Sequence, residues 1–227
     1  MAQSWHDLLF AHWPVKPEAL RPLIPAALAI DQFDGAAWIG VVPFSMTGVR
    51  LRGTPALPWL SAFPELNVRT YVTAGEKPGV WFFSLDAANA LAVLAARAAF
   101  HLPYFRARMN CEQNEGWIAY RSERTHRGAP EASLHARYRP VGEVFSARRG
   151  TLEYFLTERY CLYAADSRER VFRGEIHHPA WNVQRAEAQF SRNTMADAAG
   201  VTLPASEPLL HFARRQDMVA WAPRRIA

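Results

Sequence analysis

The sequence predicts a mainly β protein, an antiparallel β-barrel with two or three helices packed on its outside. Short apolar or alternating segments, bounded by Gly, Pro, Asn and Asp, recur along the whole chain, as is typical of strands and turns. Long stretches of helix-forming residues are few by comparison. Neither a linker, a charge block nor a repeat of fixed period divides the 227 residues, so we expect one domain that covers residues 1–227.

The N-terminal part is expected to hold two or three strands and one short helix. Alternation predicts a strand over Trp5–Trp13, with Trp5 and Leu9 on the same side. Pro17–Leu23 is expected to be a helix, because proline suits a first turn and Pro25 stops the helix. The next elements are a turn, one or two strands and a proline-containing loop at the rim of a cavity, at Phe33–Gly35, Ala37–Arg52 and Thr54–Pro64.

The segment Pro64–Met109 is the centre of the predicted fold. Its first strand alternates, with Leu66, Val68 and Val72 on one side and polar residues on the other. Asp86 is placed as the N-cap of a helix rich in Ala and Leu. After the first strand we expect a turn, a strand covered on both faces, this helix and a return strand, at residues 75–79, 80–85, 87–100 and 104–111.

The second half of the chain is expected to add six strands and two short helices. An apolar stripe predicts the first helix, and Gly200 is expected to end the second. These helices are placed at Arg149–Arg159 and Thr194–Ala199. The strands are placed at Trp117–Arg124, Ala132–Pro140, Tyr160–Ala164, Val171–His177, Ala180–Phe190 and Leu209–Trp221.

Several motifs resemble the YqjF-like family of uncharacterised bacterial proteins, and the resemblance extends over nearly the whole chain. They are NVRTYV at residues 67–72, GVWFFSLDA at residues 79–87, and shorter motifs at residues 12–15, 23–25, 33–35, 42–44 and 177–181. That family is similar in fold to acetoacetate decarboxylase, a β-barrel enzyme that forms a Schiff base through a lysine. The resemblance therefore implies an acetoacetate decarboxylase-like barrel.

The same resemblance implies that the decarboxylation chemistry is missing. Residues 96–103 match the decarboxylase pattern up to Pro103, and Tyr104 and Phe105 then replace its two lysines. A Schiff base needs a primary amine whose pKa is lowered, which a tyrosine cannot provide. The strand with the decarboxylase's acidic partner matches around Asn67, an amide. We therefore expect no Schiff-base lysine and no acetoacetate decarboxylase activity.

The polar side of the central strand carries Glu65, Asn67, Arg69 and Tyr71. One interpretation is a solvated outer face, which is common on antiparallel sheets. The other, which depends on the resemblance, is a cavity lining. In that case Arg69 would bind a carboxylate through its planar guanidinium, and Asn67 and Tyr71 would orient the ligand.

Three further residues are candidates for the site. Tyr104 would face the reacting centre, or it simply fills the space of a lysine stem. His177 and His178 point opposite ways on a strand, so one of them can face a cavity; His178 is our choice, with a structural histidine as the alternative. Trp181 belongs to the same motif and is expected to contact the ligand. Glu65 and His178 are the candidate general acids or bases.

The charge and composition of the chain limit the classes of partner that we expect. The net charge is +5 and the pI is near 9.6, but the 26 basic residues include two lysines, Lys16 and Lys77, and the arginines are scattered among acidic residues. Nucleic acid is therefore a disfavoured partner.

No zinc, Walker A, G-x-G-x-x-G or G-x-S-x-G pattern occurs, so we expect neither a metal nor a cofactor. The start has no signal-peptide pattern and no apolar run reaches the ~20 residues of a membrane span, so a soluble, cytoplasmic protein without a membrane partner is expected.

Three functions stay open on this basis. The first is a decarboxylase-like barrel that binds a small organic ligand, a keto acid or another carboxylate. The second is an enzyme that uses Glu65 or His178 as general acid or base without a Schiff base, which a pH–rate profile would separate from the first. The third is an arginine-rich nucleic-acid-binding module, whose affinity would fall steeply with salt. Turnover and a homo-oligomer are left open.

Overall fold

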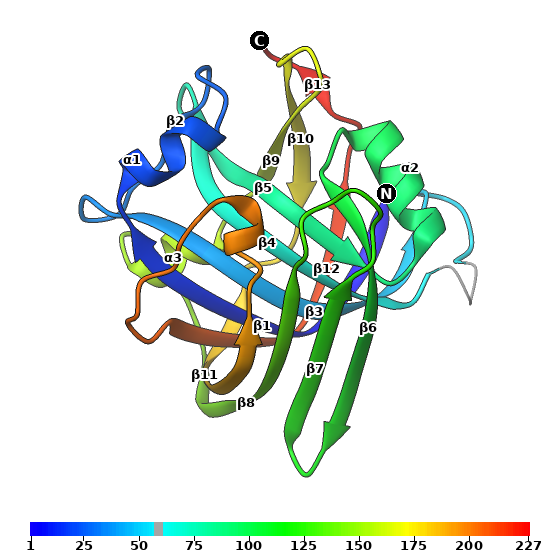
Figure 1. The fold of residues 1–227 in the computed structure, drawn as a ribbon, viewed down its shortest axis with the longest axis vertical. Helices are drawn as coiled ribbons and strands as arrows, with labels where there is room; N and C mark the ends of the chain where they lie inside the picture. Colours follow the sequence, from blue (N-terminus) through cyan, green and yellow to red (C-terminus); the bar gives the residue numbers. More distant parts are fainter. Residues whose placement is uncertain (57–60) are drawn as a thin grey trace.

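The computed structural model describes residues 1–56 and 61–227. Its described strands join into a single sheet (Figure 1). They are β1 (Ala2–Val15), β2 (Ala29–Ile30), β3 (Ala37–Arg50), β4 (Phe63–Ala74), β5 (Lys77–Ala87), β6 (Tyr104–Asn114), β7 (Trp117–Arg124), β8 (Ser133–Ser146), β9 (Cys161–Ala165), β10 (Val171–His177), β11 (Asn182–Asn193), β12 (Leu209–Ala220) and β13 (Arg224–Arg225). The α-helices are α1 (Pro17–Leu20), α2 (Ala90–Phe100) and α3 (Leu152–Thr157), and the 3₁₀ helices are η1 (Arg21–Leu23) and η2 (Asp197–Ala199).

The sheet closes on itself in two places. Neighbouring strands follow the order β13-β10-β9-β5-β6-β7-β8-β11-β12-β1-β3-β4-β2, and additional pairings join β5 to β4 and β10 to β12. The first pairing closes a ring of β5, β6, β7, β8, β11, β12, β1, β3 and β4, which we name the core ring. The second closes a ring of β5, β9, β10, β12, β1, β3 and β4, which we name the cavity ring. The predicted mainly β class with helices outside the sheet is confirmed.

The five strands that both rings share form a wall with two buried faces. On β4, Leu66, Val68 and Val72 pack in the large apolar core with residues of the core ring. The polar residues between them point the other way, yet Glu65 and Asn67 are only 3% and 5% exposed. The interpretation of this side as a solvated outer face is therefore wrong. Alternation on a strand covered on both sides sends one set of side chains to the core and the other to the interior of the cavity ring.

Most predicted elements are present with shifted ends, and two local predictions are wrong. The β1 strand has a bulge around Asp7, whose φ is +53°, so Trp5 and Leu9 lie on opposite faces instead of the same face. The N-cap of α2 is Asn89, whose side chain accepts hydrogen bonds from the amides of residues 91 and 92. Asp86 is instead the penultimate residue of β5, where its carboxylate receives two 2.7 Å hydrogen bonds from Arg124.

The predicted antiparallel pairing holds around most of the sheet but not at β5. This strand is antiparallel to β4 but runs parallel to both β6 and β9. The helix α2 is the crossover that connects β5 to its parallel neighbour β6. The loop predicted at residues 54–64 lies partly outside the described residues, and its last two residues belong to β4. In the described part of the chain, no helix has the length and apolar character that crossing a bilayer requires.

Candidate functional site

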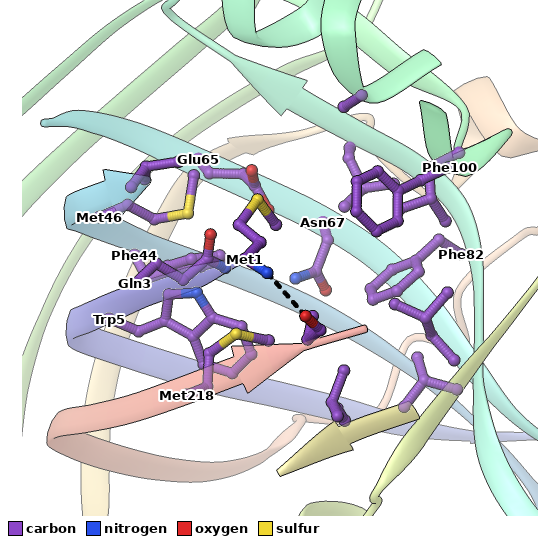
Figure 2. Close-up of a pocket in the computed structure, with 18 of the residues that line it drawn as sticks. Met1, Gln3, Trp5, Phe44, Met46, Glu65, Asn67, Phe82, Phe100 and Met218 are labelled. Atoms are coloured by element: carbon purple, nitrogen blue, oxygen red, sulfur yellow. Dashed lines mark hydrogen bonds between the residues drawn. The ribbon is translucent and has the colours of Figure 1, made fainter. Parts of the chain in front are cut away.

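The cavity ring encloses a space of about 280 Å³. Every strand of the ring contributes at least one lining residue, and the alanine-rich side of α2 closes part of the wall. Figure 2 shows Asn67 directed into this space between the aromatic rings of Phe82 and Trp5. Most of the lining is apolar, and its polar side chains come mainly from β4 and from the segments that face it. A largely apolar cavity with few polar groups is the usual form of a small-molecule site.

Glu65 and Tyr104 form a hydrogen-bonded pair in the cavity wall. The Tyr104 hydroxyl donates to the Glu65 Oε2 over 2.9 Å. Burial raises the pKa of Glu65 to about 8, with the Tyr104 hydrogen bond opposing the rise and Asp86 adding to it. Burial and the neighbouring Glu65 also raise the pKa of Tyr104 well above its ordinary value. Both groups are therefore mainly protonated at neutral pH, so the pair can donate a hydrogen bond to a ligand oxygen.

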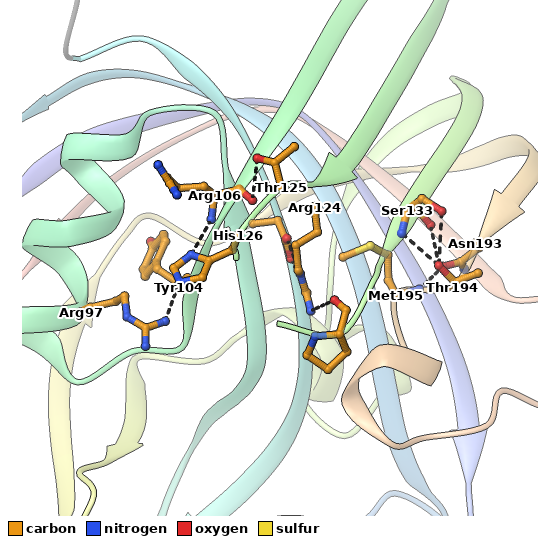
Figure 3. Close-up of polar contacts among 12 residues, drawn as sticks. Arg97, Tyr104, Arg106, Arg124, Thr125, His126, Ser133, Asn193, Thr194 and Met195 are labelled. Atoms are coloured by element: carbon orange, nitrogen blue, oxygen red, sulfur yellow. Dashed lines mark hydrogen bonds and ion pairs between the residues drawn. The ribbon is translucent and has the colours of Figure 1, made fainter. Parts of the chain in front are cut away.

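The backbone around Tyr104 is held from outside the cavity. Arg97 of α2 donates from Nη1 to the Tyr104 carbonyl oxygen over 2.7 Å (Figure 3). Two residues further along β6, the amide of Arg106 donates to His126 Nδ1 over 3.2 Å. These contacts fix the first residues of β6 beside β5, and hence the position of the Tyr104 ring.

Asn67 lies between Glu65 and Arg69 on β4. Its side chain lines the cavity and is 5% exposed, and its Oδ1 has no hydrogen-bond partner among the described residues. A buried carbonyl oxygen without a donor is destabilising by about 1–3 kcal/mol. A ligand hydroxyl or N–H group would supply the donor that this oxygen lacks.

Arg69 is a buried cation without a carboxylate partner among the described residues. It lines the cavity and is 9% exposed, and its hydrogen bonds all come from Nη2, to the Tyr71 hydroxyl and the Leu156 carbonyl, each over 3.3 Å. Its Nε is buried without a partner. Arg159, which lines the same cavity, is instead neutralised by an ion pair with Asp31.

A buried network fixes the orientation of Arg69. The Tyr71 hydroxyl donates to the Leu156 carbonyl oxygen over 2.7 Å, so His12 Nε2 donates to the Tyr71 oxygen over 2.6 Å. Burial, followed by the positive charges of Arg69 and His211, lowers the pKa of His12 well below its usual range, in keeping with a neutral ring. Gly40 allows the ring to lie here, since a Cβ at that position would come within 2.9 Å of it.

The structure brings most of the sequence-predicted site residues together. Glu65, Asn67, Arg69, Tyr104, His178 and Trp181 all line the cavity. Tyr71 does not line it. Its hydroxyl lies behind Arg69, where it accepts a hydrogen bond from Arg69 and donates one to the Leu156 carbonyl oxygen. Trp181 stacks on Trp5 with ring centroids 6.1 Å apart, so the two indoles form one side of the wall.

His178 is placed in the cavity wall, but its ring nitrogens are already used. Nδ1 lies 2.8 Å from the Pro179 carbonyl oxygen and 3.1 Å from Gln216 Nε2. Nε2 lies 3.0 Å from the Arg159 carbonyl oxygen. Neither nitrogen is free to exchange a proton with a ligand in this arrangement, so the geometry is that of a structural histidine.

No local pattern in the sequence marks the residues that form the apolar part of the lining. Phe82, Phe100, Ile176 and Met218 come from four different elements and meet at the cavity only through long-range pairing. Arg159 was also missed, because a single arginine after a short helix has no pattern that separates it from a surface residue. Within the described ranges, no three His, Cys, Asp or Glu side chains are arranged to hold a metal ion.

Solved structures with this fold include three instructive examples. The enduracididine biosynthesis enzyme MppR, complexed with the condensation product of pyruvate and imidazole 4-carboxaldehyde, matches with a TM-score of 0.67 over 99% of this chain and 88% of its own, at 12% identity. Acetoacetate decarboxylase from Legionella pneumophila gives a TM-score of 0.65 over 100% and 88%, at 9% identity. An acetoacetate decarboxylase-like enzyme from Sphingomonas wittichii RW1 gives 0.65 over 99% and 92%, at 13% identity. At these identities the likeness shows the acetoacetate decarboxylase-like fold.

Sequence similarity gives the family. The chain is 51% identical over 225 residues to "Uncharacterized protein YqjF" of Bacillus subtilis (strain 168), covering 99% of this chain and 92% of that protein. The model of the DUF2071 family, described as "Uncharacterized conserved protein", matches residues 2–217. The chain therefore belongs to the DUF2071 family, together with YqjF.

Proposed function

We propose that the cavity binds a small organic carboxylate, a keto acid being the leading candidate, with the anionic group on Arg69. The observation that carries the proposal is a buried guanidinium beside an enclosed cavity with no anionic partner among the described residues. An unpaired buried charge is destabilising by several kcal/mol, and a ligand carboxylate removes this penalty through charge-assisted hydrogen bonds. Arg159 does not need such a ligand, because Asp31 already pairs with it.

The other polar groups of the cavity suit the rest of such a ligand. Asn67 Oδ1 accepts from a hydroxyl or N–H group, since it has no other donor in the described structure. The protonated Glu65 and Tyr104 donate to an oxygen farther along the ligand, because Glu65 is four residues, about 13 Å, from Arg69 on β4 and a ketone next to the carboxylate does not reach it. Trp181 contributes an apolar surface for the carbon skeleton.

The proposed binding does not involve a Schiff base. Neither of the two lysines of the sequence lines the cavity, and the Met1 amine, which does line it and whose pKa is lowered by burial, donates to the Ala220 carbonyl oxygen over 2.7 Å. Lys77 is at the start of β5, with its Nζ 3.2 Å from Glu175, and Lys16 precedes α1. Tyr104 lies where the resemblance to acetoacetate decarboxylase places the reactive lysine. MppR has been solved in complex with pyruvate, and in our proposal a related class of ligand is held here by Arg69, without an imine.

The proposal is tested by isothermal titration calorimetry with 2-oxohexanoate and the Arg69→Met variant. Loss of hydrogen bonds to a charged group removes about 1.5–3 kcal/mol, so we expect Kd to rise by about ten- to a hundredfold. Arg215→Met is the matched control, because this arginine is on the outside of β12, with its side chain 59% exposed and paired with Asp217. Equal affinity of Arg69→Met and wild type would refute the proposal.

A second candidate is catalysis on such a ligand with Glu65 as general acid. The specific observation in its favour is the pKa of about 8, which keeps a proton on the carboxyl next to Tyr104 at neutral pH. Turnover would then decline above pH 8 and would fall by 10²–10⁴-fold in Glu65→Gln. Unchanged turnover in that variant would exclude Glu65 as the acid.

A further inference from the structure

We infer that the ligand is an amphiphilic carboxylic acid, with an apolar chain or ring well beyond the size of a four-carbon keto acid. This inference rests on the proposed carboxylate site at Arg69 and specifies the remainder of the ligand. It depends on four features of the cavity, which are its size, the position of its polar groups, the character of its far walls and the character of its rim.

The cavity is larger than a small keto acid needs. Its volume of about 280 Å³ is equivalent to about nine water molecules at about 30 Å³ each. Since a bound carbon or oxygen atom occupies a similar or slightly smaller volume, the space suits a ligand of on the order of ten non-hydrogen atoms or more. A four-carbon acid would leave much of this apolar space unfilled.

The polar groups are separated along β4. Arg69 and Glu65 lie four residues apart on one strand face, which corresponds to about 13 Å. Asn67 lies between them, and the opposing strands carry Val42 and Leu85 at its level. A four-carbon acid bound to Arg69 is too short to span this distance, whereas a longer ligand passes Asn67 and reaches the Glu65 region.

The walls on the far side of the cavity are apolar. Phe82, Leu162, Ile176 and Met218 face the site from β5, β9, β10 and β12. These strands offer hydrocarbon and thioether surface, and the charged group beside them is the Met1 ammonium, which donates to the Ala220 carbonyl oxygen over 2.7 Å. An aliphatic chain or an aromatic ring is the ligand part that such walls stabilise, at about 0.8 kcal/mol for each buried CH₂ group.

Apart from Met1 and Gln3, the described lining residues beyond Glu65 are apolar as well. In the pairing of β3 with β4, Phe44 is opposite Glu65, and Met46 is opposite Phe63. Val49 continues the lining, and Leu51 lines the cavity mouth while being 71% exposed. The cavity therefore runs from the buried cation at Arg69 to a mainly apolar mouth, so in our inference the carboxylate lies at the Arg69 end and the tail lies toward the mouth.

The test is a calorimetric series of straight-chain carboxylic acids with four, six, eight and ten carbons, measured with the whole chain. Each added CH₂ group that enters the cavity should tighten binding by about fourfold. The series should level off when the chain reaches the mouth. Equal affinity for the four- and eight-carbon acids would overturn the inference.

Two variants separate this inference from the proposed function. Arg69→Met should weaken every acid by a similar factor and leave the gain for each CH₂ unchanged. If affinity does not rise with each CH₂ group while Arg69→Met still weakens binding, the inference of an amphiphilic ligand is wrong and the proposed carboxylate site is retained. If Arg69→Met has no effect, the carboxylate site is wrong, and with it the amphiphilic acid.

The tail position is tested at the mouth. Val49→Trp should lower the affinity for the ten-carbon acid at least tenfold and leave that for the four-carbon acid unchanged. Val144→Trp is its control, since Val144 is on β8, is 60% exposed and does not line the cavity. A melting curve verifies that each variant is folded. Equal loss for short and long acids in folded Val49→Trp would contradict a tail at the mouth.

Discussion

Glu65 is the one carboxylic acid among the described residues that line the cavity, and burial perturbs its pKa strongly. Burial is the largest cause of its raised pKa, and the Tyr104 hydrogen bond, which favours the carboxylate, only partly offsets it. The neutral form has a functional consequence under our proposal, because a protonated Glu65 does not repel the carboxylate of a ligand. Anion binding is therefore expected to weaken when the pH rises through 8.

Replacing Glu65 with Gln should remove a pH-dependent part of the stability. The native carboxyl keeps its proton up to about pH 8, whereas an unperturbed one loses it near pH 4.5. The stability from this group is therefore complete below pH 4.5, falls by up to about 1.4 kcal/mol per pH unit between these values, and stays at the lower level above pH 8. Urea unfolding of both proteins from pH 4 to pH 9 measures the difference.

Tyr104→Phe provides the matched comparison. This variant loses the hydrogen bond that lowers the pKa of Glu65, so the decline in stability should extend to a higher pH than in the wild type. A decline that ends at a lower pH, or parallel profiles for wild type and Glu65→Gln, would show that the proton on Glu65 has been assigned wrongly.

At the residue scale, the sequence specifies which side chains share a face but not what lies opposite that face. The alternation of Glu65, Asn67 and Arg69 was visible, and the resemblance favoured a cavity. The sequence could not show that Arg69 lacks a counter-ion, because the partner of a buried arginine can be far away in the chain. Arg159, for example, pairs with Asp31, which is 128 residues away. The position of the Tyr71 hydroxyl behind Arg69 also depends on a long-range hydrogen bond with His12.

At the element scale, the contact between β5 and β9 is a critical closure of the cavity ring. It comprises two residue pairs, Val80 with Leu162 and Trp81 with Tyr163. Gly79 precedes them, and a Cβ at this position would come within 2.6 Å of the Cys161 Sγ and 2.8 Å of its backbone oxygen. The strands can approach this closely because residue 79 has no side chain.

Gly79→Ala should therefore destabilise the protein by about 1–3 kcal/mol, because a backbone atom cannot move aside as a side chain can. Gly174→Ala on β10 is the control, since its Cβ would meet the flexible Leu162 side chain at 3.3 Å. Urea unfolding measures both variants. An equal effect of the two would mean that the β5–β9 contact has no special role.

The elements themselves were largely predictable, because alternation, turn residues and helix formers act locally. The errors arise where a local signal is overridden by a tertiary one. Asp86 has the chemistry of an N-cap, but the bidentate contact with Arg124 holds it in β5, and Asn89 caps α2 instead. The bulge at Asp7 reverses the side-chain alternation of β1, and no glycine or proline at this point of the sequence indicates it.

At the scale of the whole molecule, one sheet makes both a packed core and a hollow site. The shared wall has apolar side chains on the core face and the polar groups of β4 on the cavity face. The cavity ring depends on two short contacts, β5–β9 and β10–β12, each of two residue pairs. Such pairings between distant segments leave no trace in a single sequence, which is why the closure followed from the resemblance and not from the residues.

The proposed site and its ligand are tested most directly by a crystal structure of the protein with 2-oxohexanoate bound. We predict density in the cavity with the carboxylate within hydrogen-bond distance of the Arg69 guanidinium and the carbon chain directed past Asn67 toward Val49. Density for the ligand outside the cavity, or a carboxylate turned toward the mouth and away from Arg69, would contradict the account.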